Sequence, residues 1–143
     1  MEEAKRFKFE IGYWYPHMMP KDIGIWERFI MTYPGYFDEC QYDVLVGSVP
    51  DFADPAKDPS NAGLDTLYRR KIDVVGWKDG QPYIVEVKPR AGTHAVGQVL
   101  GYIQLYERDY KPAVAPKPIL LTDTKQEDIQ IIADKYGVKL IVV

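Results

Sequence analysis

The sequence predicts an α/β fold, with a single domain built around a central mixed β-sheet that is flanked by helices. Runs of β-branched and aromatic residues, typical of buried strands, alternate in the second half with segments of helical periodicity. Two of these runs are separated only by a short turn around Asp79-Gly80, which indicates a hairpin. The length of 143 residues fits one domain, residues 1–143.

The first expected element is a helix over residues 23–32, preceded by an aromatic-rich extension, residues 1–21. Asp22 can cap this helix, and Pro34-Gly35 should end it. Apolar residues recur at helical spacing, which places Ile23, Trp26, Phe29 and Ile30 on one face. We interpret this aromatic stripe as core; the alternative is a platform that stacks bases or holds a partner subunit.

Three strands should follow, over residues 42–49, 69–77 and 82–88. Residues 50–65, rich in proline and aspartate, separate the first two strands and are predicted to be loop. The aspartates of this loop do not follow the spacing of a calcium-binding loop. A solvated loop is therefore the favoured interpretation, with a substrate-contacting flap as the alternative.

The C-terminal half alternates helices with strands. A helix over residues 94–109 begins after Thr93, which is a suitable N-cap, and a strand follows at residues 119–122. A second helix over residues 125–136 and a last strand over residues 138–143 complete the chain. Strands joined through helices pair in parallel, whereas the hairpin is antiparallel, so the sheet should be mixed.

Composition excludes several classes of protein. Cys40 is the only cysteine, which excludes an internal disulfide, a four-cysteine iron–sulfur cluster and the usual structural zinc sites. No apolar run approaches the ~20 residues of a membrane-spanning helix. The N-terminus lacks the pattern of a secretory signal, so we expect a cytoplasmic protein without a membrane partner.

Charge gives a weaker indication. The formal net charge of −3 argues against a surface that is basic throughout. Basic residues nevertheless gather on both sides of the expected hairpin, and could form a local strip that binds DNA or merely solvate the strand ends. They are Arg69, Arg70 and Lys71 on one side, and Lys88 and Arg90 on the other.

Charged residues interrupt the two hairpin strands. Glu86 and Lys88 lie two apart on one strand, so both side chains point the same way, and the hairpin brings Asp73 close to them. Two neighbouring carboxylates repel each other unless a cation lies between them or one is protonated. Mg²⁺ suits such a pair, and a lysine on the same face can orient or deprotonate an attacking water. The alternative is an ion pair at a sheet edge.

Ile72-Asp73 followed by Glu86-Val87-Lys88 resembles the signature of the PD-(D/E)XK, or restriction-endonuclease-like, nuclease superfamily. The resemblance implies an αβββαβ core, here with an additional C-terminal helix and strand. It implies that Asp73, Glu86 and the backbone carbonyl of Val87 bind Mg²⁺ or Mn²⁺, and that Lys88 serves the water. Ile72 replaces the proline of the family name, at a position that binds nothing.

Two further features of that superfamily can be placed. Gln98 and Tyr102 resemble the Gln-x-x-x-Tyr motif of RecB-type nucleases and would share one helix face near the site. The alternative is a polar pair on an ordinary helix. Many members carry an acid on the first helix that reaches the metal, and Glu27 is the acid inside the expected helix 23–32.

The leading hypothesis is therefore a Mg²⁺-dependent deoxyribonuclease with DNA as partner. One alternative is a catalytically silent nuclease-fold assembly protein of a virus or mobile element, acting in the host cytoplasm; another is a junction resolvase, which must be a homodimer to cut two strands symmetrically. The two histidines lack metal-ligand spacing and we interpret them as incidental, except that His94 could contact a phosphate. The candidate DNA-contacting residues are Arg69, Arg70, Arg90, Thr93 and His94.

Overall fold

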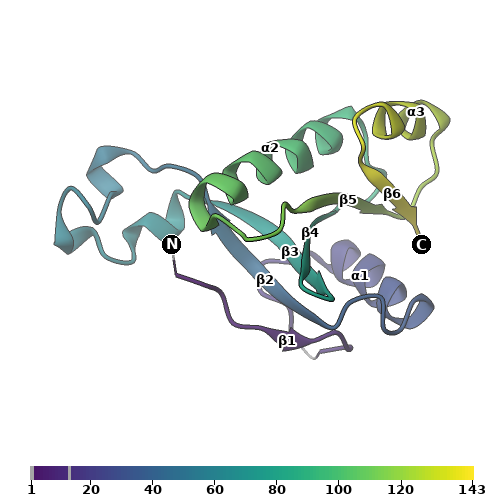
Figure 1. Ribbon diagram of the computed structural model, residues 1–143, viewed down its shortest axis with the longest axis horizontal. Coiled ribbons are helices and arrows are strands. Elements are labelled where there is room, and N and C mark those ends of the chain that lie inside the picture. Colours follow the sequence, from purple (N-terminus) through teal and green to yellow (C-terminus); the bar gives the residue numbers. More distant parts are fainter. Residues whose placement is uncertain (1, 13) are drawn as a thin grey trace.

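A six-stranded mixed sheet forms the centre of the molecule, with helix α1 on one face and helices α2 and α3 on the other (Figure 1). The computed structural model describes residues 2–12 and 14–143, so Tyr13 of the aromatic extension lies outside the described residues. The α/β class and the mixed sheet are confirmed. In chain order the elements are β1 (Phe7–Lys8), α1 (Pro20–Thr32), β2 (Glu39–Val46), β3 (Arg70–Lys78), β4 (Gln81–Val87), α2 (Thr93–Tyr110), β5 (Lys117–Thr122), α3 (Glu127–Lys135) and β6 (Lys139–Val142).

The strands lie side by side in the order in which they occur in the chain. Strands β1 to β4 pair antiparallel, whereas β4 with β5 and β5 with β6 are parallel, because α2 and α3 carry the chain back between them. The β3–β4 turn is the expected Asp-Gly step. Asp79 (φ 49°) and Gly80 (φ 79°) are both left-handed, as a two-residue hairpin turn requires.

Two apolar layers sandwich the sheet. On the α1 side, Trp26 and Phe29 are fully buried and pack with Phe37 and Val74, so the aromatic stripe of α1 is core and not a surface platform. On the other side, the buried face of α2 packs on Ile72, Val75 and Leu120.

The element boundaries differ from expectation where local signals compete. Helix α1 begins at Pro20, because a proline fits the first helical position, and its N-cap is Met19. Asp22 is therefore inside the first turn, where its carboxylate accepts a hydrogen bond from the backbone N–H of Met19 (3.3 Å). The N-cap residue of α2 is Gly92 rather than Thr93, and α3 begins at Glu127, after its N-cap Gln126. Strand β2 begins at Glu39, where it already pairs with Trp77.

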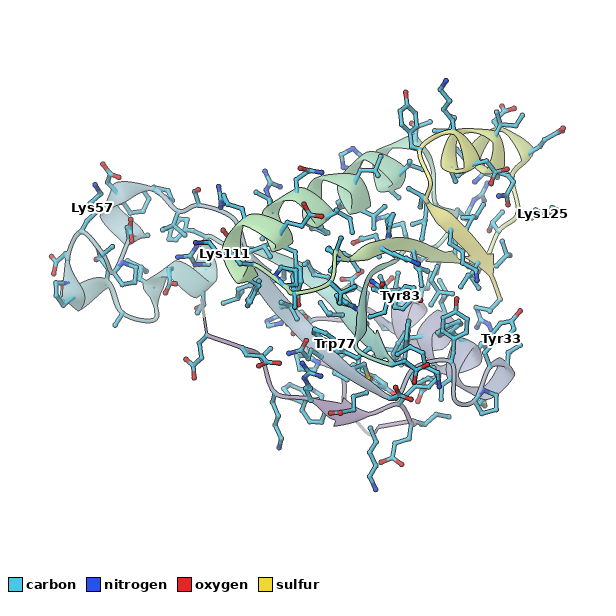
Figure 2. All side chains as sticks on the ribbon, in the orientation of Figure 1. Tyr33, Lys57, Trp77, Tyr83, Lys111 and Lys125 are labelled. Atoms are coloured by element: carbon cyan, nitrogen blue, oxygen red, sulfur yellow. The ribbon has the colours of Figure 1, made fainter. Side chains whose placement is uncertain are left out.

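The segment between β2 and β3 projects from the body of the molecule as an arm, residues 47–69 (Figure 1). The sequence predicts loop over most of this segment, and the structure adds three short 3₁₀ helices, Asp51–Ala53, Pro59–Asn61 and Leu64–Leu67. Lys57 lies toward its far end (Figure 2). Arg69 ties down its base, since it pairs with Asp65 (3.0 Å) and donates to the carbonyl of Gly47.

At one position in β2 and β3, the side chains switch from one face of the sheet to the other. Tyr42 pairs with Val74 and both pack on the α1 side, whereas Val44 and Ile72, the next pair in the same register, pack on the α2 side. Side chains two apart on a regular strand share a face, so the switch requires a local irregularity. Asp43 supplies it with a left-handed backbone (φ 51°), and the register places it opposite Asp73.

No helix in the described part of the chain has both the length and the apolar character needed to cross a membrane.

Candidate functional site

Asp73 and Glu86 are cross-strand neighbours. Val74 pairs with Val85, and the same antiparallel register continued by one residue sets Asp73 against Glu86. The Oδ2 atom of Asp73 accepts a hydrogen bond from the backbone N–H of Val87 (2.9 Å). Because that donor belongs to the main chain of β4, the Asp73 carboxylate is fixed relative to the strand that carries Glu86.

Glu86 is buried, with 6% of its surface exposed. Its Oε2 is, among the described residues, a buried side-chain oxygen without a hydrogen-bond partner. A buried polar group left without a partner is costly, more so when it is charged. The structure therefore leaves a position beside Glu86 where a ligand would compensate this cost.

The pKa values of both carboxyl groups are raised. Burial, reinforced by the neighbouring Asp73, raises the pKa of Glu86 to about 9, against the opposing effect of the Lys88 ammonium. Burial also raises the pKa of Asp73 to about 6; the Val87 N–H lowers it, and Asp22 and Asp43 raise it. Two crowded carboxylates of this kind resist ionisation until a cation joins them.

The donor set fits a hard divalent cation. Mg²⁺ takes oxygen ligands, commonly from one or two protein carboxylates, and keeps water at its other positions. Asp73 and Glu86 provide such a pair, and the unpartnered Oε2 supplies a free ligand atom. Within the described ranges no three acidic, histidine or cysteine side chains form a ready cluster. The side chain of Val87 packs in the α1-side core, which leaves only its backbone to act as a ligand.

Lys88 follows β4 and has an exposed side chain. Its backbone N–H donates to the carbonyl of Leu121 (2.9 Å), which continues the β4–β5 ladder by one residue and fixes the point where the side chain leaves the sheet. Its charge lowers the pKa of Glu86.

The charge of Asp22, in the first turn of α1, acts on this pair. Glu27 accepts a hydrogen bond from the Tyr15 hydroxyl (3.2 Å), whereas the charge of Asp22 raises the pKa of both Asp73 and Glu86. The sequence indicates only a capping role for Asp22, because it lies at the helix start. The metal-binding role expected for Glu27 stays a prediction, and the structure directs its side chain to Tyr15.

Gln98 and Tyr102 lie one turn apart on α2, and the Gln98 amide donates to the Tyr102 hydroxyl (2.8 Å). Both line a groove of about 560 Å³ along α2, together with Gly97 and Gly101. Burial raises the pKa of Tyr102, Gln98 lowers it, and Glu86 and Asp73 raise it further, which places this tyrosine within electrostatic reach of the carboxylates.

Only some of the candidate DNA-contacting residues lie at the groove along α2. Arg70 and His94 line the groove beside Gln98, and Thr93 is exposed at the first residue of α2. Arg69 is turned away, held by Asp65 and Gly47. Arg90 has a left-handed backbone (φ 46°), and its N–H donates to the Asp123 carboxylate (2.9 Å).

Comparison with known proteins supports the fold more than the chemistry. Neither a protein-family model nor a curated protein matches the sequence. The crystal structure of a protein of unknown function, AF1548, is similar with a TM-score of 0.52 and 19% identity, over 84% of this chain and 56% of that one. A repair endonuclease from Pyrococcus abyssi is similar with a TM-score of 0.45 and 26% identity, over 52% of this chain and 33% of that one.

The chain thus spans a third to just over half of the length of these two neighbours. The described residues form an α/β fold with a six-stranded mixed sheet, and AF1548 is similar to this chain in fold.

Proposed function

We propose that this protein is a divalent-metal-dependent nuclease that hydrolyses phosphodiester bonds in DNA. One observation carries the proposal: Oε2 of Glu86 is buried and has no hydrogen-bond partner. Glu86 is on β4, next to the strand that carries Asp73, and Lys88 follows two residues later. A purely structural ion pair would satisfy that oxygen within the protein. A divalent ion would satisfy it and would offset the repulsion between the two carboxylates.

Each residue then has a distinct role. Asp73 and Glu86 hold Mg²⁺ or Mn²⁺, and the Val87 N–H fixes the orientation of the Asp73 carboxylate. When bound, the ion polarises the scissile phosphate and lowers the pKa of a water. Lys88 orients that water and offsets negative charge that develops on the phosphate. The effect of its charge on the pKa of Glu86 supports this role.

The groove along α2 is the proposed path of the DNA strand. Arg70 and His94 supply cationic or hydrogen-bonding contacts to phosphates, and Gln98 and Tyr102 supply polar atoms next to the carboxylates. The protein as a whole is acidic, with a net charge of −3, so binding should depend on this local set of contacts and not on overall attraction.

The experiment is cleavage of labelled single-stranded, double-stranded and branched DNA with Mg²⁺, with Mn²⁺ or with a chelator. We expect metal-dependent cleavage by the wild type and loss of cleavage in Asp73→Ala and Lys88→Ala. Lys57→Ala, on the projecting arm, removes a lysine of equal charge far along the arm and should cut normally (Figure 2). Cleavage that survives both site substitutions unchanged would rule out this assignment.

A second candidate is a catalytically silent binding protein. Phe7, Ile11 and Trp14 are exposed (44%, 48% and 78%) around a cavity of about 280 Å³, which would suit a protein partner. Calorimetric titration with Mn²⁺ separates the two candidates: a wild type that neither binds the ion nor cuts DNA favours the binding protein. A homodimer, which a junction resolvase requires, is tested by sedimentation.

A further inference from the structure

His17 and Asp43 form a close pair that joins the N-terminal segment to the sheet. The Nδ1 atom of His17 lies 2.7 Å from Oδ2 of Asp43. Both residues have left-handed backbones, with φ of 58° and 51°. Residues other than glycine adopt this conformation uncommonly, and backbone strain of this kind gathers at functional sites.

The pair lies beside the candidate metal site. Asp43 is set opposite Asp73 across β2 and β3, and Asp73 is set opposite Glu86 across β3 and β4. The charge of Asp43 is one of those that act on Asp73. The chain after His17 leads directly into α1, whose first turn carries Asp22, and Asp22 acts on the same carboxylates. His17 is therefore connected to the candidate metal site in two ways, through its contact with Asp43 and through the chain that leads into α1.

This arrangement gives the site two ends. Asp43, Asp73 and Glu86 lie on three adjacent strands, β2, β3 and β4, which span roughly 10 Å at ~4.8 Å per strand. Lys88 follows Glu86 at one end of this set, and His17 contacts Asp43 at the other. Displacement at phosphorus is in line, so the attacking and leaving oxygens lie on opposite sides of the phosphorus atom.

The hydrogen bond also shows that Nδ1 of the imidazole ring carries a proton. A carboxylate oxygen only accepts, so Nδ1 of His17 donates its proton to Asp43. The side chain of His17 is 63% exposed, and its other nitrogen, Nε2, is the one available to a substrate. A carboxylate that orients a histidine through Nδ1 is a recurrent way to position a proton-transferring Nε2.

We propose that His17 is the general acid of the hydrolysis, and that Asp43 is the residue that positions it. The inference rests on the nuclease function proposed above. The water oxygen gives one proton to solvent and forms a bond to phosphorus, and the phosphorus–oxygen bond to the leaving sugar oxygen breaks. That oxygen keeps the electron pair and takes the proton from Nε2 of the His17 imidazolium, which carries a proton on each ring nitrogen and regains the transferred one from solvent.

The test compares two DNA substrates that differ in the leaving atom, both cut in Mn²⁺. One is ordinary DNA; in the other, sulfur replaces the bridging 3′ oxygen at the cleavage position. A thiolate leaves without being protonated, so it does not need a general acid. His17→Asn and Asp43→Asn are suitable variants, because asparagine tolerates the left-handed backbone at both positions. Lys111→Asn is the control, since Lys111 is also left-handed (φ 47°) and lies at the far end of α2 (Figure 2).

We expect His17→Asn to cut ordinary DNA about 100-fold to 10,000-fold more slowly than the wild type, and the sulfur substrate within a few-fold of the wild type. Asp43→Asn should show a smaller loss with the same rescue, and Lys111→Asn should match the wild type on both substrates. An equal loss on both substrates would mean that the pair only ties down the N-terminal segment, and would overturn the inference.

The two proposals fail in different ways. If the wild type and His17→Asn cut ordinary DNA at the same rate, the general acid is wrong and the nuclease function stands. If the wild type cuts neither substrate with either metal, the proposed nuclease function is wrong, and so is the role of His17 as general acid.

Discussion

The backbone N–H of Val87 donates a hydrogen bond of 2.9 Å to the Asp73 carboxylate. This bond joins a side chain of β3 to the main chain of β4 between Glu86 and Lys88, the two other charged residues of the site. The relative placement of the three groups therefore depends on the pairing of two strands and not on the flexibility of long side chains. A substitution at Asp73 can consequently remove the negative charge of the side chain while keeping its hydrogen bond to Val87.

Asp73→Asn should keep the geometry and remove the charge. The amide oxygen of asparagine can still accept from the Val87 N–H, but a neutral amide is a weaker ligand for Mg²⁺ than a carboxylate. We expect cleavage to fall by about 100-fold or more, with a melting temperature equal to or above that of the wild type, because the raised pKa of Asp73 shows that its charge is unfavourable there. Metal-dependent cleavage and thermal unfolding without metal measure the two effects. A variant that cuts normally would exclude Asp73 as a ligand.

The raised pKa of Glu86 predicts that stability in the absence of metal falls as pH rises. In the unfolded chain Glu86 loses its proton near its ordinary pKa of about 4.3. In the folded protein burial and Asp73 hold the pKa at about 9, so between these values the folded state binds more protons than the unfolded state. The free energy of unfolding should therefore decrease through this range and level off above the folded pKa.

Glu86→Gln is the matched variant, because it keeps the shape of the side chain and cannot ionise. Its free energy of unfolding should change less with pH than that of the wild type, and should exceed the wild-type value at pH 8. Urea unfolding between pH 5 and pH 9 in a chelating buffer measures both. Parallel curves for the two proteins would contradict the elevated pKa.

Arg70 and Arg69 are adjacent and should behave differently. Arg70 lines the groove, so Arg70→Ala should weaken DNA binding and reduce the slope of log affinity against log salt by about 1. Arg69 holds Asp65 and the Gly47 carbonyl, so Arg69→Ala should instead lower the free energy of unfolding by about 1 to 3 kcal/mol. Fluorescence anisotropy at several salt concentrations and urea unfolding give the two readouts. Equal salt slopes for the two variants would contradict this division.

Gly76→Ala should destabilise the protein. A Cβ atom at this position would lie 2.5 Å from the Phe37 ring, which is buried in the α1-side core, so the ring or the strand must shift. We expect a loss of about 1 to 3 kcal/mol in the free energy of unfolding. Gly24→Ala is the control: it lies in α1, its nearest neighbour is the flexible end of Arg28 at 3.3 Å, and it should be neutral or stabilise by up to about 1 kcal/mol. A smaller effect at Gly76 than at Gly24 would contradict this packing.

The hairpin and the helix after it are predictable from the sequence because their signals are local. Asp79-Gly80 specifies its turn by its own conformational preferences, and the apolar face of α2 follows the helical repeat. The turn, together with the strand pattern on either side of it, is enough to predict that Asp73 and Glu86 lie close together. Strand β1 is not predictable in this way, since a strand of two residues is too short to show any periodicity.

Other features depend on contacts between distant residues. Asp43 has no unusual neighbours in the sequence, and its left-handed backbone becomes visible only in the sheet, where His17 meets it. Arg69 and Arg70 have the same chemistry, and neighbouring side chains on an extended chain point to opposite sides, so their separate roles follow from the arm on one side and the groove on the other. The contact of Glu27 with the Tyr15 hydroxyl likewise joins residues that are distant in the sequence.

The short strand β1 also protects the molecule from self-association. It pairs with β2 at Cys40 and Glu39, and just before it the carbonyl of Ala4 accepts a hydrogen bond from the Gln41 side chain (2.7 Å). Without this segment, β2 would become an open edge strand, whose unpaired amide groups can recruit strands from other molecules. Arg6 and Lys8, on either side of Phe7, further discourage such pairing. A truncation that removes the first ten residues would leave the carboxylate pair intact and would yield a protein prone to aggregation.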